Sequence, residues 1–214
     1  MQLLSLNVGK PIVIEYMGKP LETGIYKQPV EGPVYLSSIQ LQGDGQADLI
    51  NHGGKDKAVC VYCSEHFDFW RQRLGRPLSF GAFGENFTVS GMVEAEVHIG
   101  DIFEVGEALV QISQPRQPCF KLGKKYDEPE LPLMFQNTGY TGYYFRVLKE
   151  GLVEKGQPVK LVERHPSAVT IKEANRVKYH DKSDWARIRA LLEIDALSES
   201  WRASFQKRLD PAEG

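Results

Sequence analysis

The sequence has few cysteines, no long apolar run, little net charge and no internal repeat. Three cysteines in 214 residues do not make a disulfide framework, and a chain of this length buries enough apolar surface to fold without one. We therefore expect free thiols and a reducing, cytoplasmic setting. No apolar run is long enough to span a bilayer, and the segment from Met1 to Tyr16 has neither a basic start nor a continuous apolar core. We therefore expect neither a membrane span nor a signal peptide.

The net charge of −2 gives no overall attraction to nucleic acid polymers or to membrane surfaces. Hydrophobic residues at 42% and charged residues at 25% are ordinary for a globular protein. A site for an anion must therefore come from a local cluster of basic residues. The scattered histidines contain no pair at the spacing typical of metal ligands.

Residues 1–165 have the pattern of a mainly β domain. Glycine and proline separate short β-rich segments at 3–8, 11–16, 34–41, 58–62, 101–105, 108–113, 143–150 and 159–164. We expect the segments at 101–105 and 108–113 to pair as a hairpin, and those at 143–150 and 159–164 to form a second pair. A helix is expected from Glu65 to Leu74, stopped by Gly75. Many short strands without βα alternation favour a closed or nearly closed β-barrel with short helices.

Residues 166–214 are predicted to form an appendage of three short amphipathic helices. Thr170 and Glu173 have the spacing of a capping box, Ser183 or Asp184 can cap a second helix, and Ser198 can cap a third. A unit of about 45 residues is too small to be stable alone, so we expect it to dock on the barrel.

The segment around Cys119 places one thiol in a stiff and cationic loop. Pro115 and Pro118 restrict φ and remove backbone donors, while Arg116 and Lys121 are close in sequence. Nearby positive charge favours the thiolate, which is the form that attacks electrophiles and ligates metals. The pattern indicates a functional thiol. The alternative interpretation is a half-buried loop cysteine with basic neighbours.

A second polar segment contains the glycine pair Gly53-Gly54. Such a pair lets the backbone approach a ligand closely and turn its N–H groups toward an anion. His52, Lys55 and Lys57 add positive charge. The segment lacks the Walker spacing, so it is not a nucleotide P-loop. The composition fits a phosphate or carboxylate site, and the alternative interpretation is a solvated polar turn.

Three further patterns have two interpretations each. In the Gly/Phe-rich segment at 80–87, Glu85 could be a general acid or base and Asn86 could donate to a bound oxyanion, although such loops more often plug a barrel end. Residues 60 and 63 are cysteines at the redox spacing, but positions three apart on a strand point to opposite faces, so we expect buried thiols. Cys119 and His52 could form a nucleophile and its base in a cysteine hydrolase.

Three segments occur in one order: Asn51 to Val59, Gly81 to Asn86, and Pro115 to Cys119. Together they resemble the MOSC family, the molybdenum-cofactor sulfurase C-terminal domain, over about residues 1–165. The three-helix tail resembles the YiiM-like branch of that family. Position 51 is Asn where Asp is common in the family, which leaves the glycine pair intact.

The resemblance implies a MOSC-type β-barrel that holds the molybdenum cofactor, molybdopterin. Cys119 would ligate molybdenum or carry sulfur, and a soft thiolate suits molybdenum. The resemblance implies that four basic residues hold the phosphate and pterin of the cofactor: His52, Lys55, Lys57 and Arg116. It also implies polar or backbone contacts from three further residues: Gly53, Gly54 and Asn86.

The YiiM-like resemblance also implies an activity, the reduction of N-hydroxylated compounds such as N-hydroxylated bases, which would detoxify them. Electrons would come from a flavoprotein reductase, and the N–OH oxygen would leave as water. Arg116 or His52 would stabilise or protonate the leaving oxygen. A second hypothesis is a sulfur or cofactor carrier without turnover, which needs the same thiolate. The hydrolase that pairs Cys119 with His52 is the third.

Overall fold

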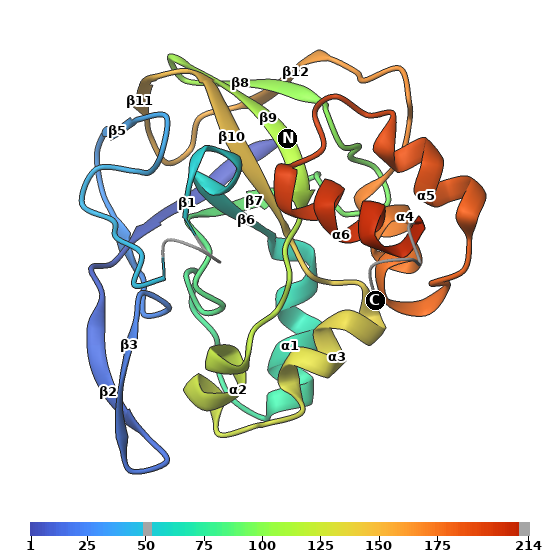
Figure 1. Ribbon diagram of the computed structural model, residues 1–214. Helices are drawn as coiled ribbons and strands as arrows, with labels where there is room; N and C mark the ends of the chain where they lie inside the picture. Colours follow the sequence, from blue (N-terminus) through green and yellow to red (C-terminus); the bar gives the residue numbers. More distant parts are fainter. Residues whose placement is uncertain (49–52, 210–214) are drawn as a thin grey trace.

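The computed structural model describes residues 1–48 and 53–209, and its centre is one eight-stranded sheet (Figure 1). The strands are, in sheet order, β12 (Val159–Glu163), β8 (Ile102–Val105), β9 (Ala108–Pro115), β10 (Tyr143–Lys149), β6 (Val59–Cys63), β7 (Phe87–Ser90), β1 (Gln2–Val8) and β4 (Gln28–Val30). Neighbouring strands are antiparallel, except that β6 and β7 run parallel. The predicted mainly β fold is confirmed.

The sheet curls until β1 meets the start of β12. The N–H of Leu3 donates to the carbonyl of Gln157 at 3.0 Å, and that of Val159 donates to the carbonyl of Met1 at 3.1 Å. These bonds make the sheet a nearly closed barrel. Two small sheets accompany it: β2 (Ile12–Tyr16) with β3 (Lys19–Thr23), and β5 (Val34–Leu36) with β11 (Gly151–Val153). The β2–β3 hairpin stands away from the barrel at the lower left of Figure 1.

One predicted strand pair is wrong. We expected residues 143–150 to pair with 159–164, but β10 pairs with β9 and β6, whereas β12 pairs with β8. The chain between β10 and β12 instead forms β11, which pairs with β5. Register in a sheet follows from which face is buried, and β10 places Tyr143 and Phe145 in the core. The predicted β8–β9 hairpin is confirmed.

The helices of the described ranges lie in two groups (Figure 1). One group is α1 (Phe67–Leu74), α2 (Phe120–Tyr126) and α3 (Leu131–Thr138), and the other is α4 (Ile171–Asn175), α5 (Trp185–Leu192) and α6 (Glu199–Leu209). Three short turns add η1 (Lys55–Lys57), η2 (Ser64–His66) and the π-helical η3 (Arg176–His180). Helix α1 ends at Gly75 in the left-handed region, as predicted. None of the described helices has the length and apolar character needed to cross a membrane.

The C-terminal helices begin at the predicted caps and share the core of the barrel. The side chains of Thr170, Asp184 and Ser198 each accept a backbone N–H three residues on, at 3.0, 3.1 and 3.3 Å. Trp201 and Phe205 of α6 are fully buried in the same apolar cluster as the inward-facing residues of the barrel. The helices are therefore packed on the barrel. A domain boundary at 165/166 stays a prediction.

Candidate functional site

Two neighbouring cavities open beside Cys119. The inner cavity has a volume of about 80 Å³, and its lining includes Cys60 of β6 and Gly84 and Asn86 of the segment before β7. The outer cavity, of about 380 Å³, lies between β9, the start of α2 and α6. Both are lined by a shared set of five residues: Asp48, Lys57, Cys119, Lys121 and Tyr144. The predicted thiol therefore stands at the junction of the two cavities.

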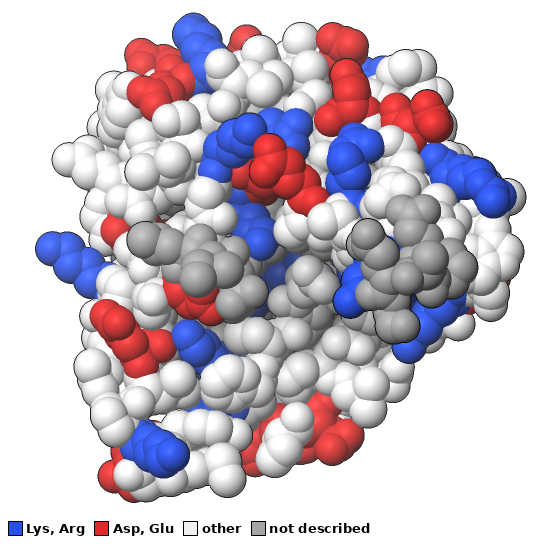
Figure 2. All heavy atoms as spheres, in the orientation of Figure 1, with Lys and Arg blue, Asp and Glu red and all other residues white. Residues whose placement is uncertain are grey.

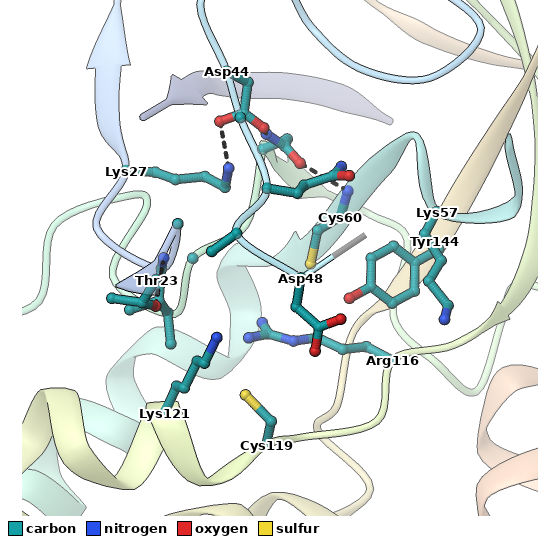
Figure 3. A pocket seen from close by; sticks show the side chains of 17 residues that line it. Thr23, Lys27, Asp44, Asp48, Lys57, Cys60, Arg116, Cys119, Lys121 and Tyr144 are labelled. Carbon is teal, nitrogen blue, oxygen red and sulfur yellow. Dashed lines mark hydrogen bonds and ion pairs between the residues drawn. The ribbon is translucent and has the colours of Figure 1, made fainter. Parts of the chain in front are cut away.

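Cys119 occupies the position just before α2, where its backbone is extended with φ −115° and ψ 162°. It lies at the end of the proline-rich segment that connects β9 to α2. It is a half-buried free thiol. Figure 3 shows its sulfur pointing into the inner cavity, across from the sulfur of Cys60 on β6. All three cysteines of the chain are free.

Arg116 is the buried cation of the inner cavity. Its Nη2 donates to the carbonyl of Phe83 at 2.6 Å, whereas its Nη1 is buried with no hydrogen-bond partner among the described residues. Burial acts to lower the pKa of Arg116, but nearby groups, Cys60 and Tyr144 foremost, hold that pKa above its ordinary value. A buried, permanently charged donor without an acceptor is costly. The arrangement therefore fits an anionic ligand.

A buried ion pair forms one wall of the inner cavity. Lys27 and Asp44 are in contact, with side chains only 6% and 1% exposed. Asp44 also accepts the N–H of Gly9 at 2.9 Å and the Nδ2 of Asn86 at 2.8 Å. The Oδ1 of Asn86 in turn accepts the N–H of Cys60 at 3.0 Å. Asn86 lines the cavity as predicted, but its amide is engaged in holding this wall together.

The inner cavity carries a local surplus of positive charge. Once Lys27 and Asp44 cancel, the described lining residues leave Lys57, Arg116 and Lys121 against the single carboxylate of Asp48. Burial lowers the pKa of Lys57, and Asp56 and Asp48 partly offset that effect. Figure 2 shows lysine and arginine atoms inside the hollow near the centre of the face. This clustering supplies the anion site that the chain's overall charge does not.

Three further predicted residues, Gly53, Gly54 and Lys55, are not among the described residues that line either cavity. Gly54 has φ 90°, the left-handed backbone expected of this loop, but Lys55 is exposed and pairs with Glu199 of α6 at 3.5 Å. His52 lies outside the described residues. Its pairing with Cys119, and with it the hydrolase hypothesis, stays a prediction.

Glu85 is a structural residue of the Gly/Phe loop and lines neither cavity among the described residues. Its fully buried carboxylate accepts the N–H groups of Gly81 at 2.6 Å and Phe83 at 3.0 Å, and the hydroxyl of Thr88 at 3.0 Å. A general acid or base must reach the reacting group. The contacts of Glu85 therefore hold the Gly/Phe-rich loop together.

The two cysteines of β6 face opposite ways, as predicted. Cys60 lines the inner cavity, and burial raises the pKa of its thiol. Cys63 points to the other side, where it donates to the carbonyl of Met92 at 3.0 Å. It lies there with His66 and Glu94, whose side chains are 2.6 Å apart. These three could hold a metal by type, but each is already engaged within the protein.

Sequence reasoning missed several residues of the site. Lys27 and Asp44 are contributed by segments that precede the three motifs in the sequence. Tyr144 of β10 lines both cavities, and burial raises the pKa of its hydroxyl, which therefore stays protonated. The placement of Asp44 between two glycines was a usable signal. Nothing in the local sequence distinguishes Lys27 or Tyr144.

Comparison with known proteins shows the family to which the chain belongs. A family model of the MOSC domain matches residues 48–160, and one of the YiiM-like 3-alpha helix domain matches residues 169–211. The chain belongs to the MOSC family and carries the YiiM-like helical domain.

Three relatives illustrate the similarity. The crystal structure of YiiM from Geobacillus stearothermophilus matches with a TM-score of 0.84 at 45% identity, over 97% of this chain and 98% of that one. The uncharacterized protein YflK of Bacillus subtilis is 55% identical over 208 residues, which cover 97% of this chain and 94% of YflK. A protein of Gibberella moniliformis named Reductase is 37% identical over 166 residues, which are 76% of this chain but 29% of that protein.

Proposed function

We propose that this protein binds the molybdenum cofactor in the inner cavity and reduces N-hydroxylated compounds, such as N-hydroxylated nucleobases. The observation that carries the proposal is the unpartnered Nη1 of Arg116 in a cationic cavity with the free thiol of Cys119 at its rim. Membership of the MOSC family supports the choice of cofactor. The relative named Reductase supports the choice of reaction class.

The residues of the inner cavity fit a group that carries both phosphate and a metal. Arg116, Lys57 and Lys121 offer cationic donors, which make the strong hydrogen bonds to phosphate oxygens. Cys119 offers a soft thiolate for molybdenum. When bound, the cofactor supplies the two-electron redox chemistry, and the protein supplies binding, orientation and protons.

The reaction converts an N–OH group to an N–H group and water, and it takes up two electrons and two protons. A flavoprotein reductase is the proposed electron donor. Lys57 is the proposed proton donor, because burial lowers its pKa and it lies in the wall shared by both cavities. Arg116, whose pKa is held above the ordinary value, stays charged and stabilises developing negative charge.

The experiment is a turnover assay on the full chain produced in a host that makes the cofactor. N-hydroxycytosine is supplied with a chemical reductant, and cytosine is measured. We expect Cys119→Ser and Arg116→Met to lower turnover by about 100-fold or more. Lys160→Met, which removes an exposed pair with Glu104 on the far strands, is the control and should leave turnover unchanged.

A cofactor-loaded wild type that forms no cytosine with any reductant would contradict the reductase proposal. A persulfide on Cys119, found by mass spectrometry in the same preparation, would then favour the carrier hypothesis. That hypothesis uses the same thiol and the same cationic cavity.

A further inference from the structure

We propose that the outer cavity is the subsite for the organic substrate, and that Gln114, Gln117 and Ser200 recognise the polar edge of an uncharged, planar heterocycle in it. This inference rests on the proposed function, because it concerns the substrate of that reaction.

The two cavities share the charged residues Asp48, Lys57 and Lys121, and they differ in the residues that each has alone. The described residues that belong to the outer cavity alone are Gln114, Gln117, Pro118, Phe120 and Ser200, and none of them is charged. The inner cavity contains the buried guanidinium of Arg116 and the Lys27–Asp44 pair. Sites for small organic ligands combine apolar walls with a few placed neutral polar groups. The anionic group is therefore assigned to the inner cavity, where Arg116 adds positive charge, and the ring is assigned to the neutral groups that only the outer cavity has.

The outer cavity also lies where a substrate could reach the thiol of Cys119. Cys119 and Tyr144 line both cavities, so a ligand in the outer cavity lies against the thiol proposed to hold the metal. Phe120, the residue after Cys119, is 50% exposed and lines the outer cavity. An exposed aromatic ring offers a face on which a planar ligand stacks.

The hydrogen-bond inventory of Gln114 and Ser200 leaves one donor and one acceptor open. The side chain of Gln114 is buried, its Oε1 accepts the hydroxyl of Ser200 at 3.1 Å, and its Nε2 donates to the carbonyl of Pro115 at 3.1 Å. An amide nitrogen has two N–H groups and a hydroxyl oxygen has two lone pairs. The hydroxyl of Ser198 lies 3.4 Å from that of Ser200 and occupies at most one of its lone pairs. One N–H of Gln114 and one lone pair of Ser200 are therefore unused. The ring nitrogen and exocyclic amine of a nucleobase present the complementary pattern.

Ser200 is held in place by contacts between α6 and the barrel. The N–H of Glu199 donates to Asp56 Oδ2 at 3.1 Å, and that of Ser198 donates to the carbonyl of Ser113 at 3.0 Å. The C-terminal helical unit, expected from the sequence only to pack on the barrel, thus contributes Ser200 to the lining of the outer cavity. In this account it takes part in substrate selection.

Calorimetric titration of the cofactor-loaded full chain with cytosine, the product base, tests the inference. We expect Ser200→Ala and Gln117→Ala each to weaken cytosine binding by about 5- to 10-fold, the loss of one hydrogen bond. The KM for N-hydroxycytosine should rise by a similar factor, and the KM for acetamidoxime, which has no ring, should not change. Molybdenum content and melting temperature should equal those of the wild type.

The matched controls come from the same elements but are not among the described residues that line the outer cavity. Ser204→Ala on α6 removes a hydroxyl that contacts Lys178, and Gln111→Ala on β9 removes an amide that contacts Gly100. Both should bind cytosine within two-fold of the wild type.

Two results would overturn the inference. One is unchanged cytosine affinity in both Ser200→Ala and Gln117→Ala. The other is a parallel loss of cytosine affinity and molybdenum, which would assign the outer cavity to the cofactor. A protein that shows the expected pattern of cytosine binding but reduces no N-hydroxylated compound would support the subsite and contradict the proposed function.

Discussion

Replacement of Asp44 by Asn should destabilise the protein and, at the same time, strengthen its binding of anions. Asp44 is the counter-ion of Lys27, and both side chains are almost fully buried. Asn keeps the shape but removes the charge, and its amide N–H groups oppose the donors of Lys27 and Asn86. Losing one partner of a buried ion pair costs about 3–5 kcal/mol.

That loss is measurable as a shift in thermal or urea unfolding. For a chain of this size, 1 kcal/mol corresponds to about 2–4 °C, so the melting temperature should fall by about 6–20 °C. Lys27→Met should also destabilise the protein, because it leaves the carboxylate of Asp44 unpaired. The double variant should be more stable than the sum of the two single effects predicts, by about 2 kcal/mol or more.

The anion measurement links this pair to the site. In the wild type, Asp44 neutralises Lys27, so the inner cavity attracts anions through Lys57, Arg116 and Lys121. Asp44→Asn exposes the charge of Lys27 to the cavity, and inorganic phosphate should bind several-fold more tightly by calorimetry. A melting temperature within about 2 °C of the wild type, together with unchanged phosphate affinity, would refute the buried pair and the charge count based on it.

Three more predictions concern single side chains. Lys57→Met should lower kcat by about 100-fold and remove the decline of activity at high pH. In the wild type, that decline should begin below the pH range in which an ordinary lysine loses its proton, because burial lowers the pKa of Lys57. Asp56→Ala removes the contacts with Arg146 at 2.8 Å and with the start of α6. It should lower the free energy of unfolding, measured in urea, by about 2–3 kcal/mol. Lys55→Ala on the same turn should lower it by less than about 0.5 kcal/mol. Burial lowers the pKa of Lys178 to about 8, so Lys178→Met should raise the free energy of unfolding by about 1–2 kcal/mol at pH 7. This gain should shrink as pH rises from 8 to 10.5, where the unfolded lysine also loses its proton. A gain that is independent of pH would contradict the assigned charge.

Local signals in the sequence predicted the elements of the fold better than their pairing. Gly75, Thr170 and Ser198 end or begin helices as expected, because caps and left-handed residues act within one turn of chain. The β10–β12 pairing was wrong, because strand order in a barrel depends on contacts far apart in sequence. A glycine loop between two β-rich segments indicates a hairpin but does not determine one.

In the candidate site, too, local sequence predicted some residues, and others are brought together only by the fold. Cys119 and Arg116 were found because prolines and charges sit beside them in the chain. Lys55 was assigned to the site by its motif, yet its side chain turns to Glu199. Lys27 and Asp44 were missed because only the fold brings their loops together. The outer cavity needed α6 to dock on the barrel, which no local pattern specifies.

The molybdenum content of the purified full chain, measured by mass spectrometry of the metal, tests the central claim most directly. The wild type, produced in a host that makes the cofactor, should contain molybdenum in proportion to protein. Cys119→Ser should lose most of it while retaining the wild-type melting temperature, because the half-buried thiol has no packing role comparable to its role as a ligand. Absence of molybdenum from the wild type, or equal molybdenum in Cys119→Ser, would contradict the account.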